Sequence, residues 1–165
     1  MKRIVVDSTV CVNWFIQARG KRDRGFALEL LEKVRAKQVR VVQPTLWRAH
    51  VAAMLLRKRG VDARKTVEGL LAVDAKDQNG PDVLRLATEL ATRFHADMFD
   101  TLYHAVAIDS GIELITANAD YLNRLGHVGH VRLLGDWVAR SRVAERQKHY
   151  RQQRAGVPAT RHKKR

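Results

Sequence analysis

The chain has 165 residues, of which 45% are hydrophobic, and a formal net charge of +14. This length suits one domain of ordinary size, and the hydrophobic content is sufficient for a buried core. No apolar run approaches the roughly 20 residues that a membrane span needs, and no apolar leader precedes a small-residue cleavage site. We therefore expect a soluble cytoplasmic protein without a membrane partner. The single Cys11 excludes an internal disulfide framework and a zinc site built from cysteines.

The positive charge is concentrated near the carboxyl end. Residues 140–165 contain ten Lys or Arg and one acid, Glu145, which is a net charge of +9. Such asymmetry indicates a polyanionic partner, and an equally good interpretation is a solvated basic tail that keeps the chain soluble. We expect one domain over residues 1–139, followed over residues 140–165 by a basic helix end and a partly disordered tail.

Strands and helices alternate in the first half of the chain. Runs of β-branched residues predict the strands, and apolar residues three to four positions apart predict the helices. In chain order, the predicted elements are a strand over 3–7, helices over 8–19 and 24–38, a strand over 39–44, and helices over 45–60 and 62–73. The polar stretch 74–80 predicts a loop.

The second half continues the alternation. Its predicted elements are helices over 81–94 and 100–111, a strand over 112–118, a helix over 119–126, a strand over 130–134 and a helix from Asp136. The apolar spacing fades near Gln147, where we expect the tail to begin. Helices between successive strands imply right-handed crossovers, so the sequence predicts an α/β sandwich with a mostly parallel central sheet flanked by helices.

Acidic and amide side chains gather where the predicted elements meet. Asp7 follows the first strand directly, and Asn118 and Asp120 follow a later strand. Asp100 opens a helix that can flank the same edge, where ligands of open parallel sheets bind. Taken singly, each of these residues can be a turn or a helix cap. Together they need a cation, and oxygen ligands suit Mg²⁺ or Mn²⁺, which activate water for phosphodiester cleavage.

His50 lies near the start of a predicted helix that can flank this edge as well. Imidazole binds Mn²⁺ and relays protons at phosphates, but a lone histidine beside Leu46 and Met54 is more often a hydrogen-bonded, half-buried residue. The aromatic residues on apolar helical faces are expected in the core rather than as stacking platforms for bases; they are Trp14, Trp47, Phe99 and Tyr103.

Four segments of the chain form an ordered set: "IVVDST", "VVQPTLWRAHVAAML", "MFDTLYHAVAIDSGIELITAN" and "VRLL". This set resembles the signatures of PIN-domain proteins, particularly the VapC-type toxins of bacterial toxin–antitoxin pairs. The resemblance spans roughly residues 3–138. Its most specific part is "DTLYHAVA" followed by "ELITAN".

The resemblance implies a PIN-like three-layer sandwich and a metal-dependent endoribonuclease that cuts RNA with metal-activated water. Asp7 and Asp100 match metal-binding acids of the family. Asn118 stands where many members have Asp, and Asp120 is close enough to supply a further carboxylate. His50 stands where the family usually has Glu and is a further candidate ligand. The resemblance also implies Mg²⁺ or Mn²⁺ as the cofactor, a cognate antitoxin as a protein partner, and a homodimer.

Two other functions stay open at this point. Because His50 and Asn118 each remove a negative charge from the family's pattern, the chain can be a PIN-fold protein with little or no nuclease activity that binds RNA through its surface and tail. A nucleotide-binding α/β domain of the doubly wound kind ranks lower, because "DSTVCVNW" after the first strand contains no glycine.

Overall fold

One parallel sheet organises the computed structural model, which describes residues 1–16, 22–58 and 61–155. Its strands, in the order β3-β2-β1-β4-β5, all run in the same direction. In chain order they are β1 (Lys2–Val6), β2 (Val39–Pro44), β3 (Ala75–Gln78), β4 (Glu113–Thr116) and β5 (Val131–Leu133). The predicted α/β sandwich with a parallel central sheet is confirmed.

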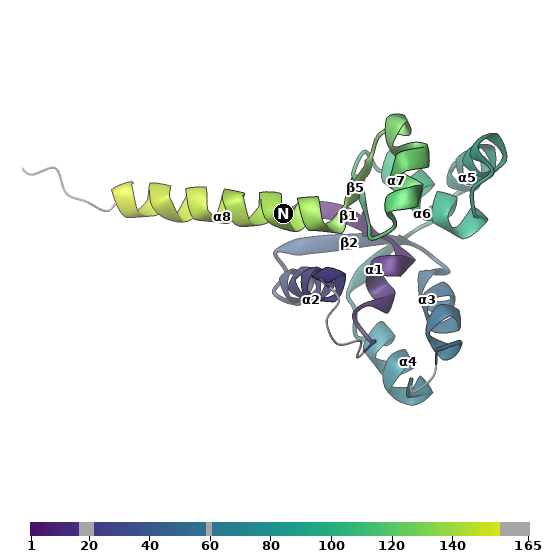
Figure 1. Cartoon of the computed structure of the whole chain (residues 1–165), viewed down its shortest axis with the longest axis horizontal. Helices are drawn as coiled ribbons and strands as arrows, with labels where there is room; N and C mark the ends of the chain where they lie inside the picture. The colour runs from purple at the N-terminus through teal and green to yellow at the C-terminus, as the bar shows by residue number, and fades with distance from the viewer. Residues whose placement is uncertain (17–21, 59–60, 156–165) are drawn as a thin grey trace, which may run out of the picture.

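Helices cover both faces of the sheet. They are α1 (Ser8–Val12), α2 (Arg22–Arg35), α3 (Trp47–Leu56), α4 (Ala63–Leu71), α5 (Pro81–Phe94), α6 (Met98–Asp109), α7 (Ala119–Leu125), the short 3-10 helix η1 (Gly126–Val128) and α8 (Leu134–Ala155). Helices α1 to α4 lie on one face and α5 to α7 on the other, as right-handed crossovers in this strand order require (Figure 1). Within the described ranges, no helix combines the length and apolar character needed to cross a membrane.

Strand β1 is the centre of the fold. Ile4, Val5 and Val6 are fully buried, as expected for a strand that is covered on both faces. The chain leaves β1 into α1 on one face, whereas it leaves the neighbouring β4 into α7 on the other face. The carboxyl ends of β1 and β4 therefore diverge, and such a switch point in an open parallel sheet is where ligands bind.

The structure differs from the predicted elements at two places in the first half of the chain. The predicted loop over 74–80 is wrong, because its centre forms strand β3 at the edge of the sheet, paired with β2. The predicted helix over 8–19 is too long: α1 ends at Val12, and the indole N–H of Trp14 donates to the carbonyl of Ala27 in α2 (3.0 Å). Residues 17–19 of that prediction lie outside the described residues.

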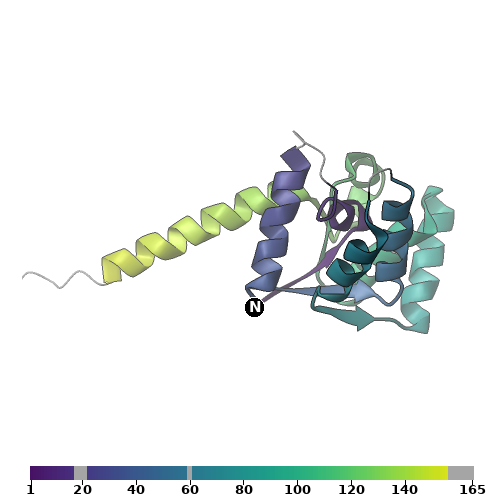
Figure 2. The ribbon, with the colours of Figure 1, turned by 90° about the horizontal axis from the view of Figure 1, so that it is seen from below.

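Helix α8 begins in the core and then leaves it. Leu134, Trp137 and Val138 are buried, whereas every described side chain from Arg142 onward is exposed. Figures 1 and 2 both show the helix extending away from the sheet, past α2. The helix continues beyond Gln147 to Ala155, and residues 156–165 of the predicted tail lie outside the described residues. A separate unit over residues 140–165 remains a prediction.

Candidate functional site

Asp7 lies at the switch point, directly after β1. Its backbone N–H donates to the carbonyl of Ile115 in β4 (2.9 Å), which joins the ends of the two strands. Its side chain is only 4% exposed, and one carboxylate oxygen accepts from the hydroxyls of Thr9 (2.6 Å) and Thr116 (2.5 Å). The hydroxyl of Ser8 donates to the other oxygen (3.3 Å). These hydroxyls hold the carboxylate in one orientation without neutralising its charge.

The turn after β4 closes on the same point. The backbone N–H of Asn118 donates to the hydroxyl of Thr116 (2.9 Å), and that of Ala117 donates to the hydroxyl of Thr9 (3.2 Å). The side-chain oxygen of Asn118 caps α7 by accepting from the backbone N–H of Tyr121 (3.1 Å). The amide oxygen that the sequence offered as a ligand therefore already serves as a helix cap.

Asp100 approaches Asp7 from the first turn of α6. The helix is capped by Asp97, whose carboxylate accepts from the backbone N–H groups of Phe99 (2.8 Å) and Asp100 (3.3 Å). Burial raises the pKa of Asp100 to about 7, and the negative charges of Asp7 and Asp97 add to this effect. The structure thus brings together two of the predicted ligands, Asp7 and Asp100, as like charges.

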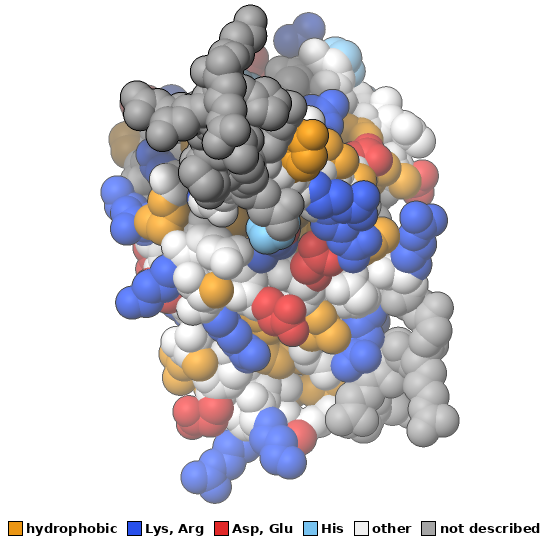
Figure 3. Space-filling model, turned by 90° about the vertical axis from the view of Figure 1, so that its left-hand side faces the viewer, with side chains coloured by type: hydrophobic (Ala, Val, Ile, Leu, Met, Phe, Trp, Pro, Cys, Tyr) orange, Lys and Arg blue, Asp and Glu red, His pale blue; other side chains and the backbone are white. Residues whose placement is uncertain are grey.

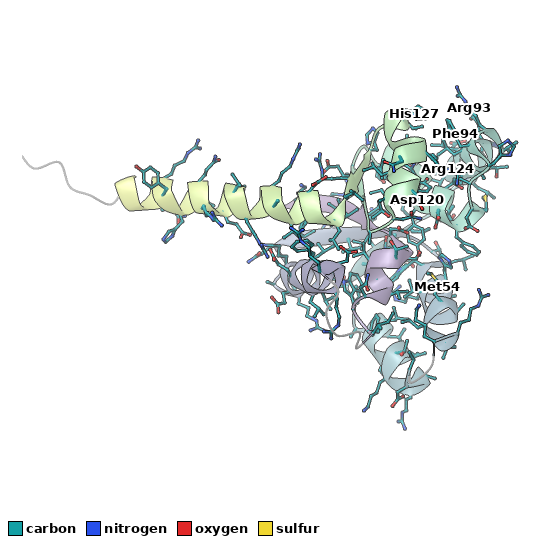
Figure 4. All side chains as sticks on the ribbon, in the orientation of Figure 1. Met54, Arg93, Phe94, Asp120, Arg124 and His127 are labelled. Atoms are coloured by element: carbon teal, nitrogen blue, oxygen red, sulfur yellow. The ribbon has the colours of Figure 1, made fainter. Side chains whose placement is uncertain are left out.

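Asp120 is placed less deeply. It is exposed in the first turn of α7, at the end of that helix nearer the sheet, whereas Arg124 and His127 lie towards the far end (Figure 4). In the described part of the chain, no three His, Cys, Asp or Glu side chains lie close enough to hold a metal ion together. The five predicted ligands are therefore not assembled as one cluster.

Asp7 and Asp100 nevertheless fit a hard cation. Mg²⁺ usually keeps several of its waters and is held by one or two carboxylates together with phosphate oxygens of a substrate. Burial raises the pKa of Asp100 and the charges of Asp7 and Asp97 raise it further, so a cation at this spot would stabilise the charged carboxylate. These two carboxylates are the residues of this chain that would hold the ion.

His50 is engaged in packing rather than directed at a cation. Its ring stacks on that of Phe99, with ring centroids 4.3 Å apart and an angle of 17° between the planes. Its Nδ1 atom lies 3.4 Å from the hydroxyl of Tyr103. Partial burial lowers the pKa of His50 although the charges of Asp7 and Asp97 oppose the shift. The imidazole is therefore neutral at neutral pH.

Phe99 is the aromatic residue whose predicted burial is wrong. Trp14, Trp47 and Tyr103 are in the core as expected, but Phe99 is 41% exposed. Together with His50 it lines a hollow of about 430 Å³ between α3 and the start of α6, which Leu46, Met54, Arg57 and Asp97 also line. Figure 4 labels Met54 on α3, on the other side of the sheet from Asp120.

A buried polar network behind the two acids was not foreseen from the sequence. His104, fully buried on α6, has its Nε2 2.7 Å from the carbonyl of Gly129 and its Nδ1 3.0 Å from the hydroxyl of Tyr121. A carbonyl only accepts, so Nε2 carries the proton and Nδ1 accepts from Tyr121. Burial, followed by the charges of Asp100 and Asp7, raises the pKa of Tyr121, which keeps this donor protonated. The network ties α7 to α6 behind the site, and no local sequence pattern marks it.

Comparison with known families agrees with this arrangement. The family model of the PIN domain matches residues 4–128, which is most of the chain. This chain belongs to the PIN-domain family. The match includes Asp7, Asp100 and the turn after β4, and it ends before α8 begins. No curated protein matches the chain in sequence.

Solved structures of a VapC toxin and of two toxin–antitoxin complexes have a similar fold. VapC20 of Mycobacterium tuberculosis, described as a sarcin–ricin loop cleaving toxin, superposes with a TM-score of 0.58 at 18% identity, over 78% of this chain and 96% of its own. A toxin–antitoxin complex from Klebsiella pneumoniae superposes with a TM-score of 0.54 at 17% identity, over 79% of this chain and 97% of its own. VapBC2 from Rickettsia felis, bound to a DNA fragment from its promoter, superposes with a TM-score of 0.55 at 17% identity, over 79% of this chain and 96% of its own. At these identities the likeness concerns the fold.

Proposed function

We propose that this PIN-domain protein is a metal-dependent endoribonuclease that acts as a VapC-like toxin, with an antitoxin protein as its partner. The family match and the likeness to VapC folds support the reaction class and the partner. The single observation that carries the catalytic part is the position of Asp100, part-buried at the switch point within the electrostatic reach of Asp7, where burial and then the charges of Asp7 and Asp97 raise its pKa to about 7. A fold without a ligand here would have no reason to keep two such charges together.

Each residue of the site has a role in this proposal. Bound Mg²⁺ or Mn²⁺ would supply a water of lowered pKa as the nucleophile and would stabilise charge on the reacting phosphate. Asp7 and Asp100 hold the ion, and the hydroxyls of Thr9 and Thr116 orient Asp7. Asp120 is exposed beside this edge, where its carboxylate can accept a proton or bind a water of the ion.

A second candidate function is a PIN-fold protein that binds RNA with little or no cleavage. The observation in its favour is that His50 stacks on Phe99 and Asn118 caps α7, so neither residue is free to act as a ligand. Only two carboxylates then remain for the ion. The affinity for the metal is therefore lower, whereas the stability of the fold is unaffected.

The test is cleavage of RNA by purified protein with Mg²⁺ or Mn²⁺, with and without a chelator. We expect cleavage that stops on chelation and that Asp7→Asn abolishes, because this change removes a central charge while it nearly preserves size. The matched control is Asp74→Asn, an equal change at an exposed residue ahead of β3. Full activity in Asp7→Asn would rule out the proposed enzyme, and RNA binding without cleavage by the wild-type protein would favour the second candidate.

A further inference from the structure

Helix α8 has two faces of different chemistry beyond the core. On the face towards α2, the guanidinium of Arg142 pairs with Glu29 (2.6 Å), and Lys33 of α2 pairs with Glu145. Glu145 is the only acid between Asp136 and the carboxyl terminus. The acids near this part of the helix are thus paired on its inner side.

The opposite face is basic. Arg140, Ala144, Gln147, Lys148 and Arg151 follow one another at spacings of four, three, one and three residues, which places them on one side of an α-helix. All five are exposed. We call this set the basic face of α8. The last four of these residues, with Gln152, also line a shallow hollow of about 340 Å³ along the helix.

The bases of this face have no acidic partner among the residues that the structure describes. The ion pairs among the described residues involve none of Arg140, Lys148 and Arg151. Like charges three or four residues apart slightly destabilise a helix, so Lys148 and Arg151 do not support α8 by themselves. An anion that lies against them would relieve this repulsion.

The position of the basic face suits a long polyanion. From Arg140 to Arg151 the helix rises by roughly 16 Å, which spans several phosphates of a nucleic acid strand. The helix that carries this face projects away from the sheet in Figures 1 and 2, and Figure 3 shows Lys and Arg side chains spread over the side of the molecule from which α8 emerges, among fewer acids. The small side chain of Ala144 between the bases leaves room for a backbone to approach.

This surface is an addition to the shared domain. The family match ends at residue 128, and α8 starts at Leu134. The VapC-type structures are covered over 96 to 97% of their own lengths but match only 78 to 79% of this chain. The chain therefore has residues beyond what those folds share, and the basic face of α8 lies after the family match.

We propose that the basic face of α8 is an arm that binds the phosphate backbone of RNA through Arg140, Lys148 and Arg151, without reading the base sequence. The choice of RNA as the polyanion rests on the proposed nuclease function. The arm acts by neutralising phosphates and releasing their counterions, so it adds salt-sensitive affinity to whatever the body of the protein binds. Cleavage at the site of Asp7 and Asp100 is independent of it once RNA is bound.

The test compares RNA binding by the wild-type protein and by a variant that combines Arg140→Ala, Lys148→Ala and Arg151→Ala. The probe is a short, labelled single-stranded RNA, titrated at several salt concentrations in the presence of a chelator. Each phosphate contact to a single strand contributes about 0.7 to the slope of log affinity against log salt, so we expect the slope to fall by about 2. Alanine preserves the helix, which circular dichroism verifies.

The matched control combines Lys58→Ala, Arg64→Ala and Lys76→Ala. These three bases are exposed and lie outside α8, so the control loses the same net charge. We expect it to keep the wild-type slope. An unchanged slope in the arm variant would overturn the proposal. This is the result expected if α8 contacts another protein instead of RNA. Equal losses in both variants would also overturn the proposal, because net charge alone would then explain the effect.

Cleavage measured with Mg²⁺ separates this proposal from the proposed nuclease function. If both hold, the arm variant cleaves at the wild-type maximal rate with a raised KM. If the wild-type protein does not cleave RNA but the salt dependence of RNA binding is weaker in the arm variant, the nuclease proposal is refuted and the arm proposal is supported. Cleavage with a wild-type slope and KM in the arm variant would support the nuclease and refute the arm.

Discussion

The acidic side chains at the two ends of strands β1 and β4 differ in their partners. At the amino end, Glu113 of β4 pairs with Lys2 of β1 (3.4 Å) and with Arg132 of β5, whose Nε donates to it at 2.8 Å. At the carboxyl end, the carboxylate of Asp7 accepts from hydroxyls, and the ion pairs among the described residues include neither Asp7 nor Asp100.

The pKa values report this contrast. Burial tends to raise the pKa of Glu113, but the hydrogen bond and charge of Arg132 and the charge of Lys2 outweigh burial and lower it. At Asp100, burial and neighbouring acids act in the same direction, and the pKa rises to about 7. The amino end contributes to stability, whereas the carboxyl end keeps an unfavourable charge that protonation or a bound cation would relieve.

The largest effect is expected from Asp100→Asn. In a chelator the variant should be more stable by on the order of 1–2 kcal/mol, allowing for solvent screening of a part-exposed group, because it removes a carboxylate whose charge is disfavoured by burial and by Asp7 and Asp97. In Mg²⁺ it should lose roughly 100-fold or more of the RNA cleavage, because one of two ligands is gone. Thermal melts and cleavage rates check both parts.

Asp109→Asn is the control for this prediction. Asp109 is exposed at the end of the same helix, where it accepts from the amide of Gln78 (3.1 Å). The change should alter stability by at most about 0.5 kcal/mol and leave cleavage intact. A loss of stability in Asp100→Asn would contradict the interpretation that the charge of Asp100 destabilises the fold and serves to bind a cation.

His50→Glu sharpens the contrast by adding a third acid at the carboxyl end. His50 lies within the electrostatic reach of Asp7, so we expect tighter Mg²⁺ binding by calorimetry, together with a lower melting temperature in a chelator. Leu56→Glu, an exposed position on the same helix, is the control and should change neither. Lower stability with unchanged affinity for Mg²⁺ would show that His50 is a packing residue alone.

The smallest effect is expected at the amino end, from Glu113→Gln. A lowered pKa in the folded state means that the carboxylate stabilises the fold above its ordinary pKa of 4.5, and that this contribution is lost as the pH falls through the lower folded value. The variant should therefore be less stable by about 0.5–1 kcal/mol at neutral pH and equal to the wild type in strong acid, with cleavage unchanged. Urea unfolding at the two pH values checks this. Glu89→Gln, exposed on α5 and in none of the ion pairs of the described residues, is the control and should be as stable as the wild type at neutral pH.

Local patterns were sufficient for much of the architecture. Alternating β-branched runs and helical spacings predicted the parallel sheet, because a strand buried on both faces and an amphipathic helix each have a signature within a few residues. Strand β3 was not predicted by these local patterns. Its sequence "AKDQ" is polar, and it becomes a strand because the edge of β2 offers unpaired backbone groups at that position.

The sequence by itself determined which residues lie at the carboxyl edge, since Asp7 must follow β1 wherever that strand packs. What each neighbour does there was decided by tertiary structure. Phe99 is exposed and stacks on His50 because α3 meets the start of α6, and Asn118 caps α7 because the turn after β4 is short. Exposure and hydrogen bonding depend on which elements lie alongside, and these come from distant parts of the chain, so no local pattern contains them.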